Sequence, residues 1–205
     1  MLFSSIPFLY YFLPLALIFY FLAPAKFKNT VLLAFSLIFY GGGEPKYLFL
    51  MIVSIGAGYG FGLLLERYRQ KPAARWICFC SVAVSLGFLL YFKYADFFLE
   101  NINAVTGLEL GLLNIALPIG ISFYTFQMIS YTVDVYRGEP AQRNPLHLAT
   151  YIAMFPQLIA GPIVRYSQIA AQLQRRTHSV DLAALGIRRF LLGLGKKILI
   201  ANQLG

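Results

Sequence analysis

Four polar side chains share one face of an otherwise apolar segment, and they are the candidates for lining a cavity. Gln127, Ser130, Tyr131 and Asp134 lie at positions i, i+3, i+4 and i+7, which is one stripe of a helix. An aspartate at the centre of a bilayer costs about 2.5–3.5 kcal/mol. We therefore predict that the stripe faces a bundle interior or a wet cavity. Hydrogen bonding between helices is the simpler alternative, and Asp134 could instead reach headgroup water or pair with Arg137.

The residues that usually carry catalysis give no further site. A histidine would serve best as the general base for acylating a hydroxyl, but His147 and His178 both lie outside the centres of apolar segments and have no carboxylate near in sequence. We interpret both as solvated loop histidines. Cys78 and Cys80 lie two apart in an apolar run without a neighbouring histidine or carboxylate, which argues against a metal site. The chain has no nucleophile elbow, phosphate loop or paired-carboxylate motif, so the residues alone define no reaction.

The composition of the chain places these residues in a membrane. Of its 205 residues, 59% are apolar and 12% are charged, and its mean hydropathy is +0.68, whereas soluble domains are roughly 45–50% apolar and 25% charged. So few charges cannot cover the apolar surface, which means that lipid must be the solvent. The net charge of +9 lies in short loops between apolar runs, and this pattern argues against nucleic acid as a partner.

The apolar runs predict an all-α fold, a polytopic bundle of transmembrane helices that forms a single membrane domain over residues 1–205. The third run contains two pairs of glycines four residues apart, Gly56/Gly60 and Gly58/Gly62, which allow another helix to approach closely. The predicted transmembrane helices are 6–22, 30–40, 47–65, 76–92 and 118–136.

The charges of the loops predict the orientation. If the N-terminus lies outside, every loop between the predicted helices obeys the positive-inside rule, because the loops that then lie inside are basic and the others hold more acids or a balanced pair. The basic residues of the inside loops are Lys26, Lys28, Arg67, Arg69, Lys71, Arg75, Arg137 and Arg143.

The next run, 146–160, is short for a span and is followed by Gly161-Pro162. If it crossed the membrane, Arg165, Arg175 and Arg176 would lie outside, against the same rule. We therefore predict a re-entrant segment that returns to the inside and lines a cavity, with a tilted span as the alternative. The tail, 181–203, is predicted to be an amphipathic basic helix that lies in the inner interface or leads into a further span.

Three stretches of the chain resemble the bacterial membrane-bound O-acyltransferase family. They are the opening MLFSSIPFL, the stretch LPIGISFYTFQMISYTVDVYR over 117–137, and the stretch over 151–166 that contains MFPQLIAGPIVRY. The resemblance implies an inner-membrane protein that moves an acetyl or other acyl group from a cytoplasmic donor, acetyl-CoA or another acyl carrier, to an exported polysaccharide such as alginate. It also implies periplasmic partner proteins for acetylation or export, and no bound cofactor.

The chain also departs from the family pattern. Members are longer, and their essential histidine lies in the second half, in an Arg-Trp-His-like context that does not occur here. Neither His147 nor His178 matches it, so no catalytic residue is carried over. We expect the chain to be the N-terminal part of a longer enzyme and to be inactive alone. Two other functions stay open: a transporter or polysaccharide-export component, for which re-entrant segments are equally natural, and an assembly protein without chemistry.

Overall fold

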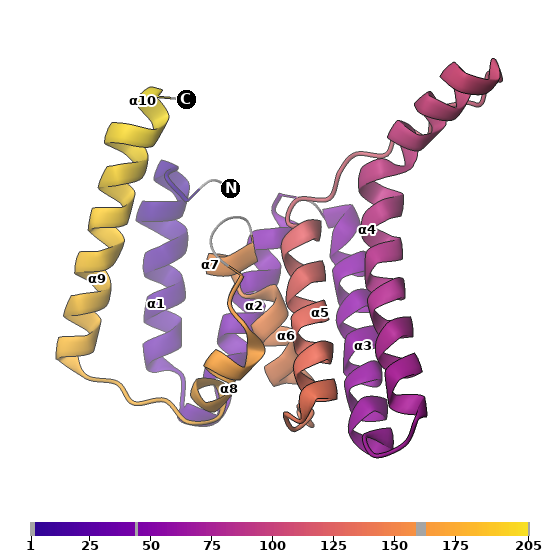
Figure 1. The fold of residues 1–205 in the computed structure, drawn as a ribbon. Coiled ribbons are helices and arrows are strands. Elements are labelled where there is room, and N and C mark those ends of the chain that lie inside the picture. The colour runs from indigo at the N-terminus through magenta and orange to yellow at the C-terminus, as the bar shows by residue number, and fades with distance from the viewer. Residues whose placement is uncertain (1–2, 44, 159–162, 205) are drawn as a thin grey trace.

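The computed structural model describes residues 3–43, 45–158 and 163–204, and within these ranges it contains helices and no strand, which confirms the all-α prediction. Figure 1 shows the arrangement. The first apolar run is a π-helical turn, η1 (Phe8–Phe12), that continues as α1 (Leu13–Leu22), and a 3-10 turn, η2 (Ala25–Phe27), leads into α2. The helices that follow are α2 (Lys28–Gly41), α3 (Pro45–Tyr68), α4 (Ala73–Thr106), α5 (Ile121–Arg137), α6 (Pro145–Ala153), α7 (Phe155–Leu158), α8 (Tyr166–Gln174), α9 (Val180–Gly195), the π-helical η3 (Lys196–Ala201) and α10 (Asn202–Leu204).

Helices α3, α4 and α5 pack together, and α3 can lie close to α5 because glycines face it. A Cβ on Gly58 would lie 2.7 Å from Met128 Cε, and a Cβ on Gly62 would lie 2.8 Å from Tyr131 Cε1, closer than nonbonded carbon atoms approach. The Gly58/Gly62 pair is therefore the close contact that the sequence predicted. The other pair does not make one, since a Cβ on Gly56 or Gly60 would meet no atom within 4 Å.

Two helices of the described residues, α3 and α4, are long and apolar enough to cross a membrane, and the run Phe8–Leu22 is apolar but shorter. Only 28% and 17% of the most apolar stretches of α3 and α4 are buried within the protein. The core helix of a soluble protein would be mostly buried, so the exposed apolar surface of these helices is suited to lipid.

The segment from α6 to α8 runs along α2 and comes back to the end where it started. Thr150 Oγ1 of α6 donates to the Asn29 carbonyl at the start of α2 (3.2 Å), and the Phe155 amide of α7 donates to Ser36 Oγ (3.2 Å), seven residues further along α2. Asn29 Nδ2 then donates to the Leu173 carbonyl at the end of α8 (2.8 Å). The excursion therefore reaches about 10 Å along α2, at 1.5 Å per helical residue. Residues 159–160 of the predicted re-entrant run, and the Gly161-Pro162 break, lie outside the described residues.

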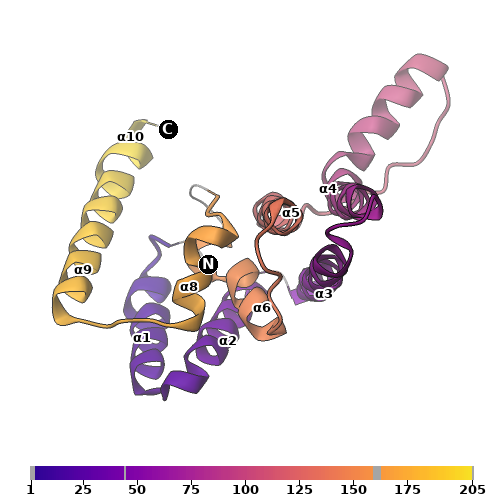
Figure 2. The ribbon, with the colours of Figure 1, turned by 60° about the horizontal axis from the view of Figure 1, so that its bottom comes forward.

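One sequence prediction needs correction. The helix predicted over 76–92 is longer, because α4 continues to Thr106 and its polar residues Asp96 and Asn103 bond the returning chain. Within the run 146–160, α6 ends at Ala153 and α7 begins at Phe155, and its re-entrant course stays a prediction. The tail is helical as predicted, and Figure 2 shows it apart from the bundle; none of its described residues is buried.

Candidate functional site

The polar stripe of α5 is positioned by a close contact at the start of that helix. Gly120, the residue before α5, has φ +77°, a left-handed conformation that glycine adopts without strain. A Cβ on Gly120 would lie 2.6 Å from the Leu158 carbonyl oxygen of α7. Glycine is thus required twice, for the turn into α5 and for the close approach of α7. The contact brings α7 beside the first half of the stripe.

Gln127, the first residue of the stripe, faces a second glutamine on α7. Its side chain is 1% exposed, and its Nε2 donates to Gln157 Oε1 at 3.1 Å. Among the described residues, no group donates to Gln127 Oε1. An amide oxygen that is buried without a donor is costly, and native proteins rarely leave one. The amide pair therefore offers a free acceptor inside the protein.

Tyr131, one turn further along α5, is the centre of a buried polar cluster. The Gln142 amide donates to Tyr131 Oη (3.1 Å), and Gln142 Nε2 donates to Tyr166 Oη (2.9 Å). The rings of Tyr131 and Tyr166 meet edge to face at 5.0 Å, and Tyr151 packs on Tyr166 at 5.4 Å. The cluster joins α5, α6 and α8.

The remaining two residues of the stripe are half-buried. Asp134 Oδ2 accepts from Ser167 Oγ of α8 at 3.5 Å, a weak bond. Within the described part of the chain, Asp134 forms no ion pair with Arg137, and the ion pair found there joins Glu66 and Arg143 at 3.5 Å. Ser130 lies between Gln127 and Asp134 on the same face.

Three residues of the stripe thus contact the segment from 142 to 167: Gln127 contacts Gln157, Tyr131 contacts Gln142, and Asp134 contacts Ser167. The role of the stripe in lining a cavity stays a prediction. A small cavity of about 10 Å³, room for about one water, lies between α3, α4 and α5, and its lining includes Tyr124, Thr125 and Met128 but none of the four predicted residues.

Sequence reasoning missed the partners of the stripe. Gln142, Gln157, Tyr166 and Ser167 were not singled out, although Gln157 stands in the quoted stretch MFPQLIAGP as the one amide among apolar residues. A polar residue inside an apolar re-entrant run is a signal that could have found it. Tyr166 and Ser167 carry no such signal, because they border a basic loop.

The two histidines lie outside the stripe of α5. His178 is exposed, its Nε2 lies 3.0 Å from Tyr20 Oη, and its ring stacks on Tyr20 at 5.7 Å. His147 is half-buried in the first turn of α6. Neither histidine contacts a residue of the stripe through a described bond. Within the described ranges no three His, Cys, Asp or Glu residues come together as metal ligands would.

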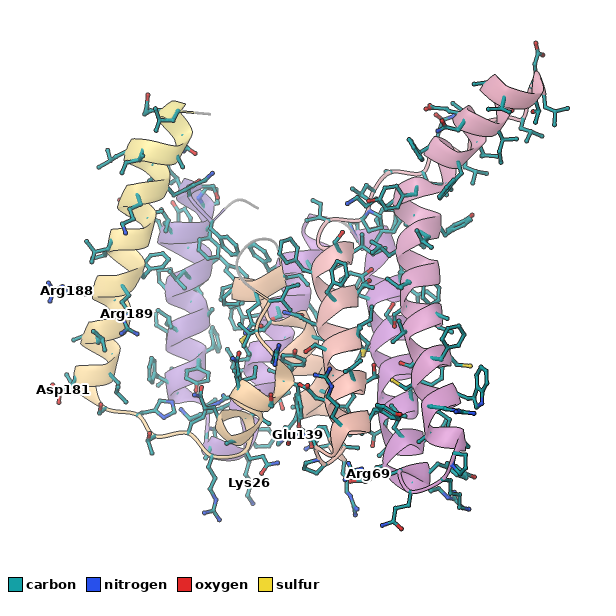
Figure 3. All side chains as sticks on the ribbon, in the orientation of Figure 1. Lys26, Arg69, Glu139, Asp181, Arg188 and Arg189 are labelled. Atoms are coloured by element: carbon teal, nitrogen blue, oxygen red, sulfur yellow. The ribbon has the colours of Figure 1, made fainter. Side chains whose placement is uncertain are left out.

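The basic loops are bonded to one another at one end of the bundle. Arg69 donates to the Val135 carbonyl (3.3 Å) and to the Glu139 carbonyl, and Arg176 donates to Asn29 Oδ1. Figure 3 shows Lys26, Arg69 and Glu139 at this end. The last of these bonds joins residues that lie 147 positions apart in the chain. Loops whose charges obey the positive-inside rule would gather in this way if they shared one face of a membrane.

Comparison with known proteins gives relatives along the whole chain. A probable alginate O-acetylase of Pseudomonas syringae is 44% identical over 211 residues, which cover 100% of this chain and 40% of the relative. One of Azotobacter vinelandii is 43% identical, covering 100% of this chain and 42% of the relative. A peptidoglycan O-acetyltransferase of Helicobacter pylori is 32% identical, covering 99% of this chain and 45% of the relative.

The chain therefore spans about two fifths of the length of the alginate O-acetylases that it matches. No family model matches it, and no solved structure does. The match covers 100% of this chain, so the stripe of α5 and the segment from α6 to α8 lie within the matched region. On this evidence, the chain is a homologue of the alginate O-acetylases along its whole length, which confirms its resemblance to the bacterial membrane-bound O-acyltransferase family.

Proposed function

We propose that the protein is part of an O-acyltransferase that moves an acetyl or other acyl group to a hydroxyl of an exported polysaccharide. The observation that carries the proposal is the similarity along the whole chain to proteins named for acetyl transfer to alginate and to peptidoglycan. Both named acceptors are glycans, so a sugar hydroxyl is the acceptor group that these relatives have in common. Alginate is the first candidate because its acetylases are the more similar.

We further propose that the chain crosses the bacterial inner membrane several times, with its N-terminus outside. The apolar exposed surfaces of α3 and α4 support the crossing. The bonds that join Arg69 to the 135–139 turn and Arg176 to Asn29 support one shared basic face, which the positive-inside rule assigns to the cytoplasm.

The segment from α6 to α8 is proposed to be re-entrant from the cytoplasmic face. Its support is the contact of both its ends with the start of α2, through Thr150 and Leu173, and of its inner part with Ser36. Irregular backbone at membrane depth is tolerated where protein or water surrounds it. The apposition of this segment to the stripe of α5 would give the acyl group a polar path, in which the free Gln127 Oε1 accepts a bond from a passing hydroxyl or amide.

The donor is proposed to approach from the basic end. Acetyl-CoA and phosphopantetheine-bearing carriers are anionic, and a field of clustered cations attracts them. On the opposite side, periplasmic proteins for acetylation or export would present the polysaccharide. The general base that takes the hydroxyl proton, with a typical worth of about 10²–10⁴ in rate, is proposed to come from sequence outside these 205 residues.

The experiment that tests the proposal is O-acetylation in bacteria that lack their own enzyme. A longer protein that contains these residues should restore ester-bound acetate on the exported polysaccharide, measured by proton NMR before and after mild alkali. The 205 residues alone should restore none, even in cells where immunoblots detect them in the membrane. Acetylation by the short chain that is abolished by His147→Ala or His178→Ala would contradict the assignment of the base. Absence of acetylation with the longer protein correctly inserted, for alginate and for peptidoglycan, would overturn the proposed function.

A further inference from the structure

The C-terminal part of α4 and the chain that follows it form an arm, residues 93–117, which extends past the bundle and leans away from it in Figures 1 and 2. Helix α4 has 34 residues, or about 51 Å at 1.5 Å per residue, whereas the hydrocarbon core of a bilayer is about 30 Å thick. The helical part of the arm is therefore the part of α4 that exceeds the length needed for a straight crossing of the hydrocarbon core.

Two polar side chains of the arm helix, those of Asp96 and Asn103, bond the returning chain. Asp96 Oδ1 accepts from the Leu113 amide (2.7 Å). Asn103 bonds Leu110 in both directions, because its Nδ2 donates to the Leu110 carbonyl (2.8 Å) and its Oδ1 accepts from the Leu110 amide (3.0 Å). The return segment, from Gly107 onward, is therefore held along the polar face of the helix.

The opposite face of the arm helix is uncovered and carries large apolar side chains beside Asn101, whose amide bonds the Phe97 carbonyl of the same helix. Phe98, Ile102 and Val105 lie at i, i+4 and i+7, and their side chains are 52%, 43% and 86% exposed. Val105 is nine residues from Asp96, which is half a turn around the helix. This face continues a stripe of exposed side chains spaced seven residues apart along α4, namely Val84, Tyr91, Phe98 and Val105. Its first two members lie in the stretch that is suited to cross the membrane.

We propose that the arm lies on the membrane surface, with Phe98, Ile102 and Val105 in the boundary between headgroups and acyl chains and with the return segment toward water. Continuity with the lipid-suited face of α4 favours lipid as the occupant. The orientation follows from the backbone: the return segment also carries exposed leucines, but it has no regular secondary structure, and its amides and carbonyls that bond no protein group require water. An amphipathic helix in this position sinks its apolar face about 5–10 Å below the headgroups. The proposal goes beyond acyl transfer and depends neither on that function nor on which side the arm lies.

The test measures the depth of spin labels in the full-length protein, reconstituted in vesicles of phosphatidylethanolamine and phosphatidylglycerol. In a background in which Cys78 and Cys80 are replaced by serine, a nitroxide is attached at Val105, at Phe98 or, as the control on the return segment, at Glu109. Relaxation by oxygen, which concentrates in lipid, is compared with relaxation by a water-soluble nickel chelate. All three positions are exposed, so the labels disturb no packing.

We expect the ratio of oxygen to nickel accessibility to be several-fold higher at Val105 and Phe98 than at Glu109. Equal ratios at the three positions, with high nickel accessibility, would show that the arm projects into water. Low accessibility of Val105 and Phe98 to both reagents would show that protein covers this face. Either result would overturn the proposal, whether or not the protein transfers acyl groups.

Discussion

Replacing Gly62 by alanine is the sharpest test of the contact between α3 and α5. The new Cβ would lie 2.8 Å from Cε1 and 2.9 Å from Cζ of Tyr131. Tyr131 cannot move freely, because its hydroxyl accepts from the Gln142 amide and its ring packs on Tyr166. Overpacking of this kind costs about 1–3 kcal/mol. Gly58→Ala should cost less, because the Met128 side chain that it meets is flexible.

The matched control is Gly60→Ala, two residues away on the same helix, where the new Cβ meets no atom within 4 Å. Both substitutions replace a helical glycine by alanine, and this replacement by itself stabilises a helix by roughly 0.5–1 kcal/mol. The difference between the two variants therefore isolates the steric cost, and we expect Gly62→Ala to be less stable by about 1–3 kcal/mol. The free energy of unfolding is measured by titration with dodecyl sulfate in mixed micelles. Equal stability of the two variants would refute the packing described for α3 and α5.

Two further predictions concern the basic end. Arg176→Gln removes the bonds to Asn29 and Tyr20 and should lower the free energy of unfolding by about 1–3 kcal/mol. Arg175→Gln removes the same charge from an exposed neighbour and should change this free energy little; equal losses would show that only charge matters. In intact cells, a single cysteine at Lys46 should react with a membrane-impermeant thiol reagent, and single cysteines at Arg143 and Arg175 should both stay protected. Labelling at Arg175 while Arg143 stays protected would show that the segment from α6 to α8 crosses the membrane.

The sequence predicted the helical elements well because apolar runs and break residues are local signals. It could not say which pair of glycines meets a neighbour: Gly56/Gly60 and Gly58/Gly62 have the same spacing, and only the position of α5 distinguishes them. The helix predicted over 76–92 was too short for a related reason. Asp96 and Asn103 continue the helix because they bond the amides of Leu113 and Leu110, and these partners become available only when the chain turns back.

The sequence predicted one half of the candidate site, the stripe of α5, but not the residues that contact it. Helical spacing found the face of α5 that carries Gln127 and Asp134, because the period of the helix fixes which residues share a face. The partners Gln157 and Ser167 come from a segment about 30 residues later, and no periodicity links the two stretches. Only the tertiary contact between α5 and the segment from α6 to α8 identifies them.

The most direct measurement of the proposed acyl path is the acetyl content of exported polysaccharide in cells whose enzyme is replaced by a longer protein with Gln127→Leu. Its control is Phe126→Leu, which places the same side chain one residue away, where Phe126 is 43% exposed and Gln127 is 1% exposed. Both variants must reach the membrane in equal amounts. Acetylation that falls several-fold with Gln127→Leu and stays near the unsubstituted level with Phe126→Leu is the predicted result. Equal acetylation by the two variants would contradict a role of the buried glutamine pair in acyl transfer.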